Sequence, residues 1–324
     1  MALTDEGLVP IPGMASRWVR LASGARAHYM TAGDHGPAVV LLHGGLPGSS
    51  GTAGWRFMAP YLGANGFRVY CPDQPGFGHA DTSPEHQPDG VHSHVDFLQE
   101  FTTALCLDRF HLAGNSMGCM NTVNYVVAHP ERVISYALIA GGIGDQLPPS
   151  TPRPEGGIAI PPYQGTRESM RELMTTIIHR GEAVTDDVIE MRYLAAERQR
   201  EAHARYWPSL MQYGGRVPWE DPALAARMST RGRLDRLGIP AVYLYGRQDV
   251  LNPVESGYQQ EDVLPEVQFF YPDDCGHQGQ TDRPDLFNPL FLEFFRDGKV
   301  TRQTADAAGI SKRRPELAHL VEQV

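Results

Sequence analysis

The chain has 324 residues, 41% of them hydrophobic and 20% charged, a composition typical of a globular protein and not of a disordered or fibrous one. Its formal charge of −10 and the lack of a basic stripe argue against a nucleic-acid partner. No apolar run approaches the roughly 18 residues that a membrane helix needs, and the first residues, MALTDEGLVPIPG, lack the basic and apolar blocks of a signal peptide. We therefore expect a cytoplasmic protein without a membrane partner.

The first half of the chain alternates strand and helix patterns. Alternating apolar and polar residues over 16–32 predict a hairpin, and the run AVVLL at 38–42 is typical of a strand buried on both faces. Further strands are expected over 68–71 and 133–139, and helices over 54–65 and 92–105. This rhythm predicts an α/β fold, with a mainly parallel twisted sheet and helices on both of its faces.

The strand rhythm stops between residues 144 and 233. A Pro-rich segment over 147–162 comes first, and helical patterns follow at 166–180, 185–206 and 221–228. Thr185 and Asp186 form a plausible cap at the start of the second of these helices. We interpret the block 144–233 as an inserted helical cap that covers the site and shapes a substrate pocket.

Strand patterns return at 241–245 and 267–271, and a closing helix is expected over 284–296. The predicted domains are therefore a core of 1–143 and 234–297, the cap at 144–233, and a polar extension at 298–324 that the core does not need.

Four cysteines lie in or beside predicted core elements, without CxxC spacing: Cys71, Cys106, Cys119 and Cys275. We expect buried thiols in a reducing compartment, with a disulfide or a zinc site as the minor alternative. No metal or cofactor site is predicted.

The stretch GNSMG places Ser116 between Gly114 and Gly118, after an apolar run and before a helical pattern. This spacing is typical of the nucleophile elbow, a turn so tight that both flanking positions must lack a side chain. The N–H of Met117, at the start of the helix, would stabilise developing negative charge. A buried strand also runs into His43, Gly44 and Gly45, where the backbone of Gly45 is the candidate second oxyanion donor.

A serine nucleophile needs a base and an acid that orients the base. Asp249 and His277 follow the strands predicted at 241–245 and 267–271, so both reach the sheet edge where Ser116 lies. Asp145, which follows the strand at 133–139, is the rival acid, and Asp273 and Asp274 are weaker rivals. His43 is expected to have a structural role. Four other histidines occur too early in the chain for the base and are expected to face solvent: His79, His86, His92 and His94.

With these residues placed, residues 16–297 resemble the α/β-hydrolase superfamily. Within it, GNSMG, HGGLPG, DQPGFG, CGHQGQ and the cap stretch IEMRYLAAERQ resemble the meta-cleavage product hydrolases, which cleave a carbon–carbon bond in vinylogous diketones from aromatic-ring degradation. The resemblance implies a Ser116–His277–Asp249 triad and an oxyanion hole of Gly45 and Met117.

The resemblance also implies a set of substrate contacts. Asn115 and Arg192 would hold the dienol and carboxylate end of the substrate, and Gly44 and Gln278 would belong to the same pocket. The planar guanidinium of Arg192 suits a carboxylate, although a solvated charge on a cap helix is an equal alternative. The chain departs from the family where a tryptophan usually follows the catalytic histidine, since Gln278 stands there, and where an asparagine usually follows the HGG loop.

The sequence therefore predicts a serine hydrolase of a small-molecule substrate, with the oligomeric state left open. Carbon–carbon bond hydrolysis is the main hypothesis, and a carboxylic ester or lactone hydrolase is the alternative. A ligand sensor that reuses the fold would need a broken triad, and haloalkane or epoxide hydrolases would need an aspartate in place of Ser116.

Overall fold

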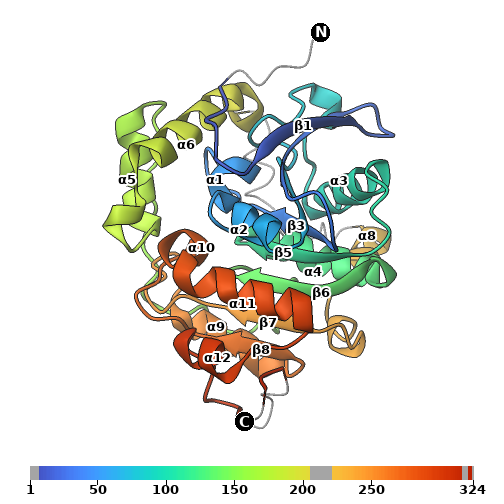
Figure 1. The fold of residues 1–324 in the computed structure, drawn as a ribbon, viewed down its shortest axis with the longest axis vertical. Coiled ribbons are helices and arrows are strands. Elements are labelled where there is room, and N and C mark those ends of the chain that lie inside the picture. Colours follow the sequence, from blue (N-terminus) through green and yellow to red (C-terminus); the bar gives the residue numbers. More distant parts are fainter. Residues whose placement is uncertain (1–6, 205–220, 316–319, 323–324) are drawn as a thin grey trace.

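The computed structural model describes residues 7–204, 221–315 and 320–322 of the chain. One eight-stranded sheet runs through it in the order β1-β2-β4-β3-β5-β6-β7-β8 (Figure 1). β1 (Ala15–Arg20) and β2 (Arg26–Ala32) form an antiparallel hairpin, and β2 also pairs antiparallel with β4. The remaining strands pair in parallel. The parallel strands are β3 (Ala38–Leu42), β4 (Arg68–Pro72), β5 (Phe110–Asn115), β6 (Val133–Ile139), β7 (Ala241–Leu244) and β8 (Val267–Phe270). The predicted α/β fold is confirmed.

Both faces of the sheet are covered, because alternate residues of each central strand point to opposite sides. In β3, Val40 and Leu42 join one hydrophobic cluster, and Val39 and Leu41 join the other. The first cluster includes α3 (Val91–Ala104) and α4 (Met117–Ala128). The second is built from α1 (Gly51–Trp55), α2 (Met58–Ala64), α11 (Pro284–Asp297) and α12 (Arg302–Ala307). Two further helices are α9 (Val254–Val263) and α10 (Gly279–Asp282).

The helix predicted over 54–65 is two helices, α1 and α2. The first begins earlier than predicted, because the Oγ of Ser50 accepts the N–H of Ala53 and caps it. Pro60 has no N–H to donate to the carbonyl of Arg56, so a hydrogen bond that would join the two helices is missing at this point.

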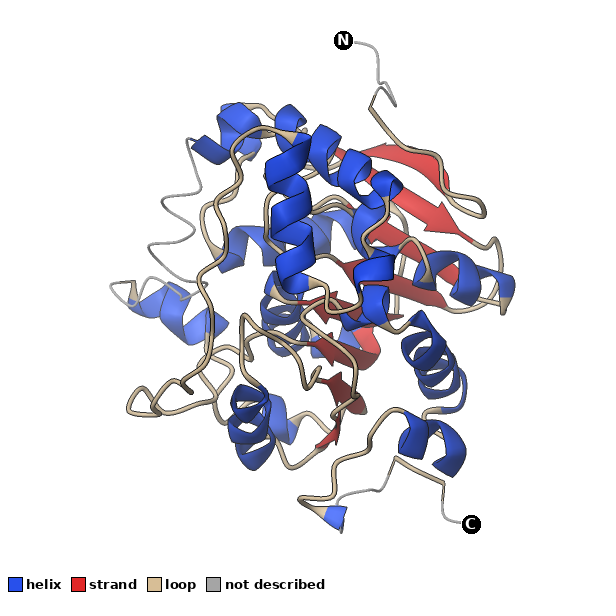
Figure 2. Ribbon diagram, turned by 90° about the vertical axis from the view of Figure 1, so that its left-hand side faces the viewer, coloured by secondary structure: helices blue, strands red, loops and turns tan. Residues whose placement is uncertain are grey.

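The cap contains α5 (Arg167–Ile177) and α6 (Asp186–Arg198). The predicted cap residue Thr185 accepts the N–H of Val188 through its Oγ1. Helices α5 and α6 pack together through a separate apolar cluster that also holds Ala53 of α1. They lie to one side of the strands in Figure 1 and stand in front of them in Figure 2. The end of the helix predicted over 185–206 lies outside the described residues.

The third helix expected in the cap packs differently. Helix α8 (Pro222–Met228) contacts α4, and its Met228 is buried in the first hydrophobic cluster, between the sheet and helices α3 and α4. Its Arg227 pairs with Asp96 of α3. This helix therefore packs on the core and not on α5 or α6.

The C-terminal segment was expected to be unnecessary for the core, and this expectation is wrong. Val300, Ala305 and Ile310 are buried in the second cluster, and Ile310 forms an antiparallel bridge with Phe270 of β8. The N–H of Ser311 donates to the carbonyl of Phe269 at 2.9 Å. The segment covers what would otherwise be an open edge of the sheet.

Three predicted exposures are also wrong. His79 is 4% exposed, and its backbone N–H donates to the buried carboxylate of Asp73. His94 is 2% exposed and lies on the face of α3 that packs against the sheet. Cys106 is exposed just after α3, whereas the other three cysteines are buried; all four are free thiols. None of the described helices is long and apolar enough to cross a membrane.

Candidate active site

Ser116 lies at the turn between β5 and α4, in a backbone conformation that L-residues rarely adopt (φ 57°, ψ −115°). A Cβ at Gly114 would lie 2.1 Å from the carbonyl oxygen of Gly118, and a Cβ at Gly118 would lie 2.3 Å from that of Leu42. Both flanking positions therefore require glycine, as the motif predicts. The Ser116 side chain stands at the carboxyl end of the central strand β5.

The loops after β7 and β8 bring Asp249 and His277 together at the same edge. Nδ1 of His277 lies 2.8 Å from Oδ2 of Asp249. The other carboxylate oxygen of Asp249 accepts the N–H groups of Leu251 and Asn252 at 2.8 and 3.1 Å, which fixes its orientation. Nε2 of His277 is buried and has no hydrogen-bond partner among the described residues. The imidazole is thus oriented from one side, and its second nitrogen remains available to a reacting proton.

The three rival acids form hydrogen bonds or ion pairs with residues other than His277. Asp145 accepts the Ser229 hydroxyl at 2.7 Å and the N–H groups of Thr230 and Arg231 at 2.7 and 2.9 Å, so it ties together the two ends of the inserted block. Asp273 accepts from Gln248, and Asp274 faces the cap residues His179 and Arg180.

The candidate oxyanion donors are neighbours. A Cβ added at Gly45 would lie 2.9 Å from the Met117 sulfur. A Cβ added at Gly44 would lie 3.3 Å from the Cβ atom of Ser116. The HGG loop therefore lies directly on the elbow, and a side chain at Gly44 or Gly45 would press against Ser116 or Met117. This proximity is what two N–H groups need if they are to converge on one oxygen.

A hydrogen-bonded chain holds the HGG loop in place. The backbone N–H of Gln74 donates to Nε2 of His43 at 3.0 Å, and Nδ1 of His43 lies 2.7 Å from the carbonyl of Gly44. The Gln74 amide donates to the His43 carbonyl at 2.7 Å and accepts from Asn121 at 2.6 Å. Burial lowers the pKa of His43 to about 4, so it is a neutral, structural residue near pH 7.

Arg192 projects from α6 of the cap into the interior and is 2% exposed. Among the described residues its side chain has one hydrogen-bond partner, the Ser49 hydroxyl, which lies 3.0 Å from Nη1. Burial, and to a lesser extent the nearby charge of Arg56, lower the pKa of Arg192 to about 9. A guanidinium offers five N–H donors, and no ion pair joins that of Arg192 to a carboxylate of the described residues. The alternative of a solvated surface charge is excluded.

Asn115 and Gln278 are both buried, but they are placed differently from each other. The Asn115 amide donates to the carbonyls of Ile139 and His277, each at 3.1 Å, so its N–H groups hold the loop of the candidate base. Gln278 caps the start of α10 next to His277 and is 4% exposed.

The one group of side chains among the described residues with metal-ligand spacing is His28, Asp73 and His79. Its carboxylate already accepts three N–H groups, from His28 Nδ1 at 2.8 Å and from the backbones of Gly51 and His79 at 2.7 Å each. These bonds and the nearby histidines hold the pKa of Asp73 well below its usual range, although burial opposes this shift. The group is better explained as a hydrogen-bonded anchor than as a metal site.

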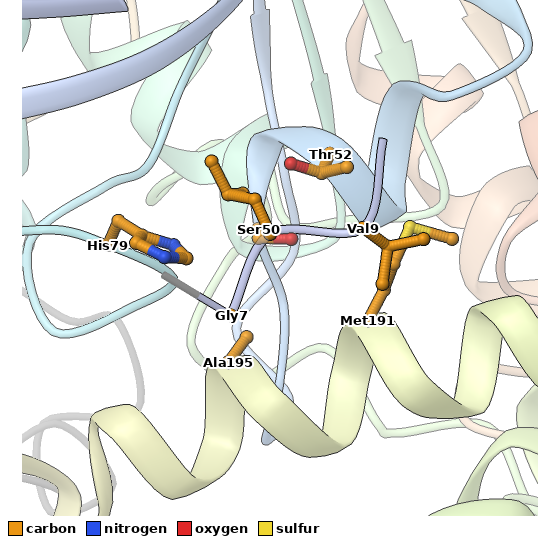
Figure 3. Close-up of a pocket in the computed structure, with 8 residues that line it drawn as sticks. Gly7, Val9, Ser50, Thr52, His79, Met191 and Ala195 are labelled. Carbon is orange, nitrogen blue, oxygen red and sulfur yellow. The ribbon is translucent and has the colours of Figure 1, made fainter. Parts of the chain in front are cut away.

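A small pocket lies between the N-terminal segment, α1 and α6 (Figure 3). Met191 and Ala195 face it from α6, Ser50 and Thr52 line it at the start of α1, and His79 lines it as well. None of the candidate triad residues lines this pocket.

The chain is similar to known hydrolases in sequence and in fold. A family model described as the alpha/beta hydrolase fold matches residues 37–176. The 2-hydroxy-6-oxo-6-phenylhexa-2,4-dienoate hydrolase of Burkholderia cepacia is 29% identical over 281 residues, which span 85% of this chain and 93% of that protein. The 2-hydroxy-6-oxononadienedioate/2-hydroxy-6-oxononatrienedioate hydrolase of Comamonas testosteroni is 26% identical, with the same coverage. The structure of a meta-cleavage product hydrolase from Pseudomonas fluorescens matches with a TM-score of 0.69 at 26% identity, over 87% of this chain and 98% of that one.

The chain has the α/β-hydrolase fold, and the relatives that it matches over most of its length are hydrolases, so we assign it as a hydrolase. It is similar to the meta-cleavage product hydrolases in both sequence and structure.

Proposed function

We propose that this enzyme hydrolyses a carbon–carbon bond in a vinylogous diketone that carries a carboxylate, the class formed by cleavage of an aromatic ring. The observation that carries this proposal is the buried guanidinium of Arg192, whose only described partner is a hydroxyl group. An ester or lactone hydrolase needs the same serine, histidine and acid but has no need for a buried cation. A carboxylate substrate would supply the missing anion through charge-assisted hydrogen bonds.

In the proposed reaction, the dienol first tautomerises to the ketone. Nε2 of His277 then takes the proton of Ser116 as its oxygen attacks the ketone carbon, and Asp249 stabilises the imidazolium that forms. The backbone N–H groups of Gly45 and Met117 bind the oxyanion. The carbon–carbon bond breaks as the imidazolium of His277 gives its proton to the departing carbanion. The neutral imidazole then takes a proton from water, which attacks the acyl group on Ser116 and releases the acid, and the Ser116 oxygen regains its proton from His277.

The cap provides an apolar environment for the rest of the substrate. The cluster of α5 and α6 includes Met170 and Ile189, and Leu46 beside the HGG loop and Leu251 beside Asp249 pack against it. An apolar wall that joins the cap to both catalytic loops suits a hydrocarbon chain and keeps water away from it.

The test compares substrates in parallel. The purified enzyme is given a yellow ring-cleavage dienolate, such as 2-hydroxy-6-oxo-6-phenylhexa-2,4-dienoate, and, separately, p-nitrophenyl esters and lactones. Bleaching of the dienolate at a catalytic rate, with release of both carboxylic acid products, supports the proposal. Turnover of the esters or lactones alone would replace it with the ester or lactone alternative.

A further inference from the structure

The loop that carries His277 is bound to the cap as well as to the sheet. The backbone N–H of His277 donates to the carbonyl of Ile177, at the end of α5, at 3.1 Å. A Cβ at Gly276 would lie 3.0 Å from that same carbonyl oxygen and from the backbone nitrogen of His179. The two backbones are therefore in close contact at the point where the candidate base leaves the core.

One buried carboxylate joins these two segments. Asp282, at the end of α10, is 3% exposed. Its Oδ2 accepts the N–H of Gly276 at 2.8 Å and that of His179 at 3.3 Å, and its Oδ1 accepts the N–H of Arg180 at 2.8 Å. A single side chain thus binds the backbone on both sides of the junction between the cap and the histidine loop.

We propose that Asp282 is a positioning residue that holds the cap segment 177–180 and the loop of His277 as one unit, so that the imidazole reaches its working position only when the cap is seated. The inference rests on the proposed role of His277 as the base. A displacement of about 1 Å in a catalytic group can cost on the order of 100-fold in rate, so a tie of this kind acts on turnover.

The surface contacts at the same junction provide a contrast. Asp274 faces the same cap residues from outside, 3.3 Å from Nε2 of His179 and 3.6 Å from Nε of Arg180, and its side chain is 55% exposed. Exposed pairs of this kind contribute little. If electrostatic attraction between the cap and the loop positioned His277, the loss of Asp274 would lower activity as much as the loss of Asp282. If backbone hydrogen bonds position His277, only the loss of Asp282 would lower activity.

The first test replaces Asp282 with Asn and, as the matched control, Asp274 with Asn. The readout is the rate at which a fluorophosphonate labels Ser116, because labelling needs the serine and its base but not the natural substrate. We expect Asp282→Asn to slow labelling and to lower kcat by about 10- to 100-fold. KM should stay within about threefold of the wild-type value, since the substrate contacts are intact. Asp274→Asn should stay close to wild type in both assays.

A second pair of variants separates positioning from folding. Arg180→Pro removes the backbone N–H that Asp282 accepts, whereas Arg180→Ala removes the same ion pairs but keeps that N–H. We expect Arg180→Pro to slow labelling and Arg180→Ala to leave it unchanged. This pair leaves both Asp282 and the histidine loop intact.

The outcomes are distinct. A melting temperature lowered by Asp282→Asn, with wild-type labelling and kcat in the folded protein, would reduce Asp282 to a structural residue and overturn the inference. Equal effects of Asp274→Asn, or of Arg180→Ala and Arg180→Pro, would overturn it as well. Slow labelling in Asp282→Asn in an enzyme that turns over esters but no dienolate would uphold the inference while the carbon–carbon proposal fails. A wild-type enzyme that is not labelled at all would overturn both.

Discussion

His277 and Asp249 come from the loops after neighbouring strands, and Nδ1 of the histidine lies 2.8 Å from Oδ2 of the aspartate. Both side chains are buried, with 2% and 0% exposed. This contact turns Nε2 away from the acid and leaves it without a partner among the described residues.

Replacing Asp249 with Asn should lower kcat by about 10⁴-fold, because the amide would favour the wrong tautomer of His277. Asp145→Asn is the matched control, since Asp145 follows the neighbouring strand β6 but bonds to residues 229–231. Steady-state kinetics on any accepted substrate measures both variants. A larger loss in Asp145→Asn would assign the acid to the loop after β6.

Replacing Arg192 with Lys should lower kcat/KM for the dienolate far more than for a neutral p-nitrophenyl ester. A planar guanidinium can bind a carboxylate through two hydrogen bonds, each worth about 1.5–3 kcal/mol, and a lysine cannot reproduce that geometry. Arg171→Lys, on the exposed side of α5, is the control. Equal losses on both substrates would mean that Arg192 supports the packing of the cap and would favour the ester or lactone alternative.

Replacing Gly118 with Ala should destabilise the fold by more than about 1 kcal/mol, the scale of overpacking in a dense interior. The new Cβ would lie 2.3 Å from the rigid carbonyl of Leu42. Gly181→Ala is the control, because no atom lies within 4 Å of the Cβ it would add. Urea unfolding measures both free energies. If the Gly118→Ala protein were as stable as the Gly181→Ala protein, the elbow could relax around a side chain and position 118 would not require glycine.

Stability should fall as the pH drops from 7 toward 5. Burial lowers the pKa of His43 to about 4 and that of His94 to about 3, whereas an unfolded histidine titrates near 6.5. Because the unfolded state binds protons first, the folded state is disfavoured below about pH 6.5, by up to about 1.4 kcal/mol per pH unit for each such group.

The pH slope can be assigned with one variant. Both ring nitrogens of His94 lack a hydrogen-bond partner among the described residues. His94→Leu should therefore keep or raise the free energy of unfolding at pH 7 and should reduce its dependence on pH between 5 and 7. An unchanged pH dependence would show that His94 does not remain neutral in the folded protein.

The sequence predicted the frame of the site because that part depends on chain order. Parallel strands end at one edge, so residues that follow β5, β7 and β8 must lie near each other whatever the details of packing. The contact between His277 and Asp249 follows from this rule. That Ser116, His277 and Asp249 act as a catalytic triad stays a prediction.

Contacts between segments far apart in the chain could not be predicted from the sequence. The Asn115 amide bonds to the His277 carbonyl, and Asp282 bonds to cap residues more than 100 positions away. Neither bond has a local motif, because each joins segments that only the tertiary fold brings together. The burial of His94 was missed because a histidine was expected to face solvent, and the packing of Ile310 against β8 was missed because the segment 298–324 is polar overall.

In the proposed reaction, Ser116 attacks a ketone carbon of a dienolate that the cap holds. The most direct measurement mixes the yellow dienolate with wild-type enzyme and with Ser116→Ala in a stopped-flow spectrophotometer and follows its absorbance. We predict catalytic bleaching by the wild type, and binding without bleaching by the variant, whose kcat should be lower by about a million-fold. Ser116→Ala should stay folded, because its partly exposed hydroxyl contributes little to packing. Bleaching by the variant at a rate near that of the wild type would contradict the account.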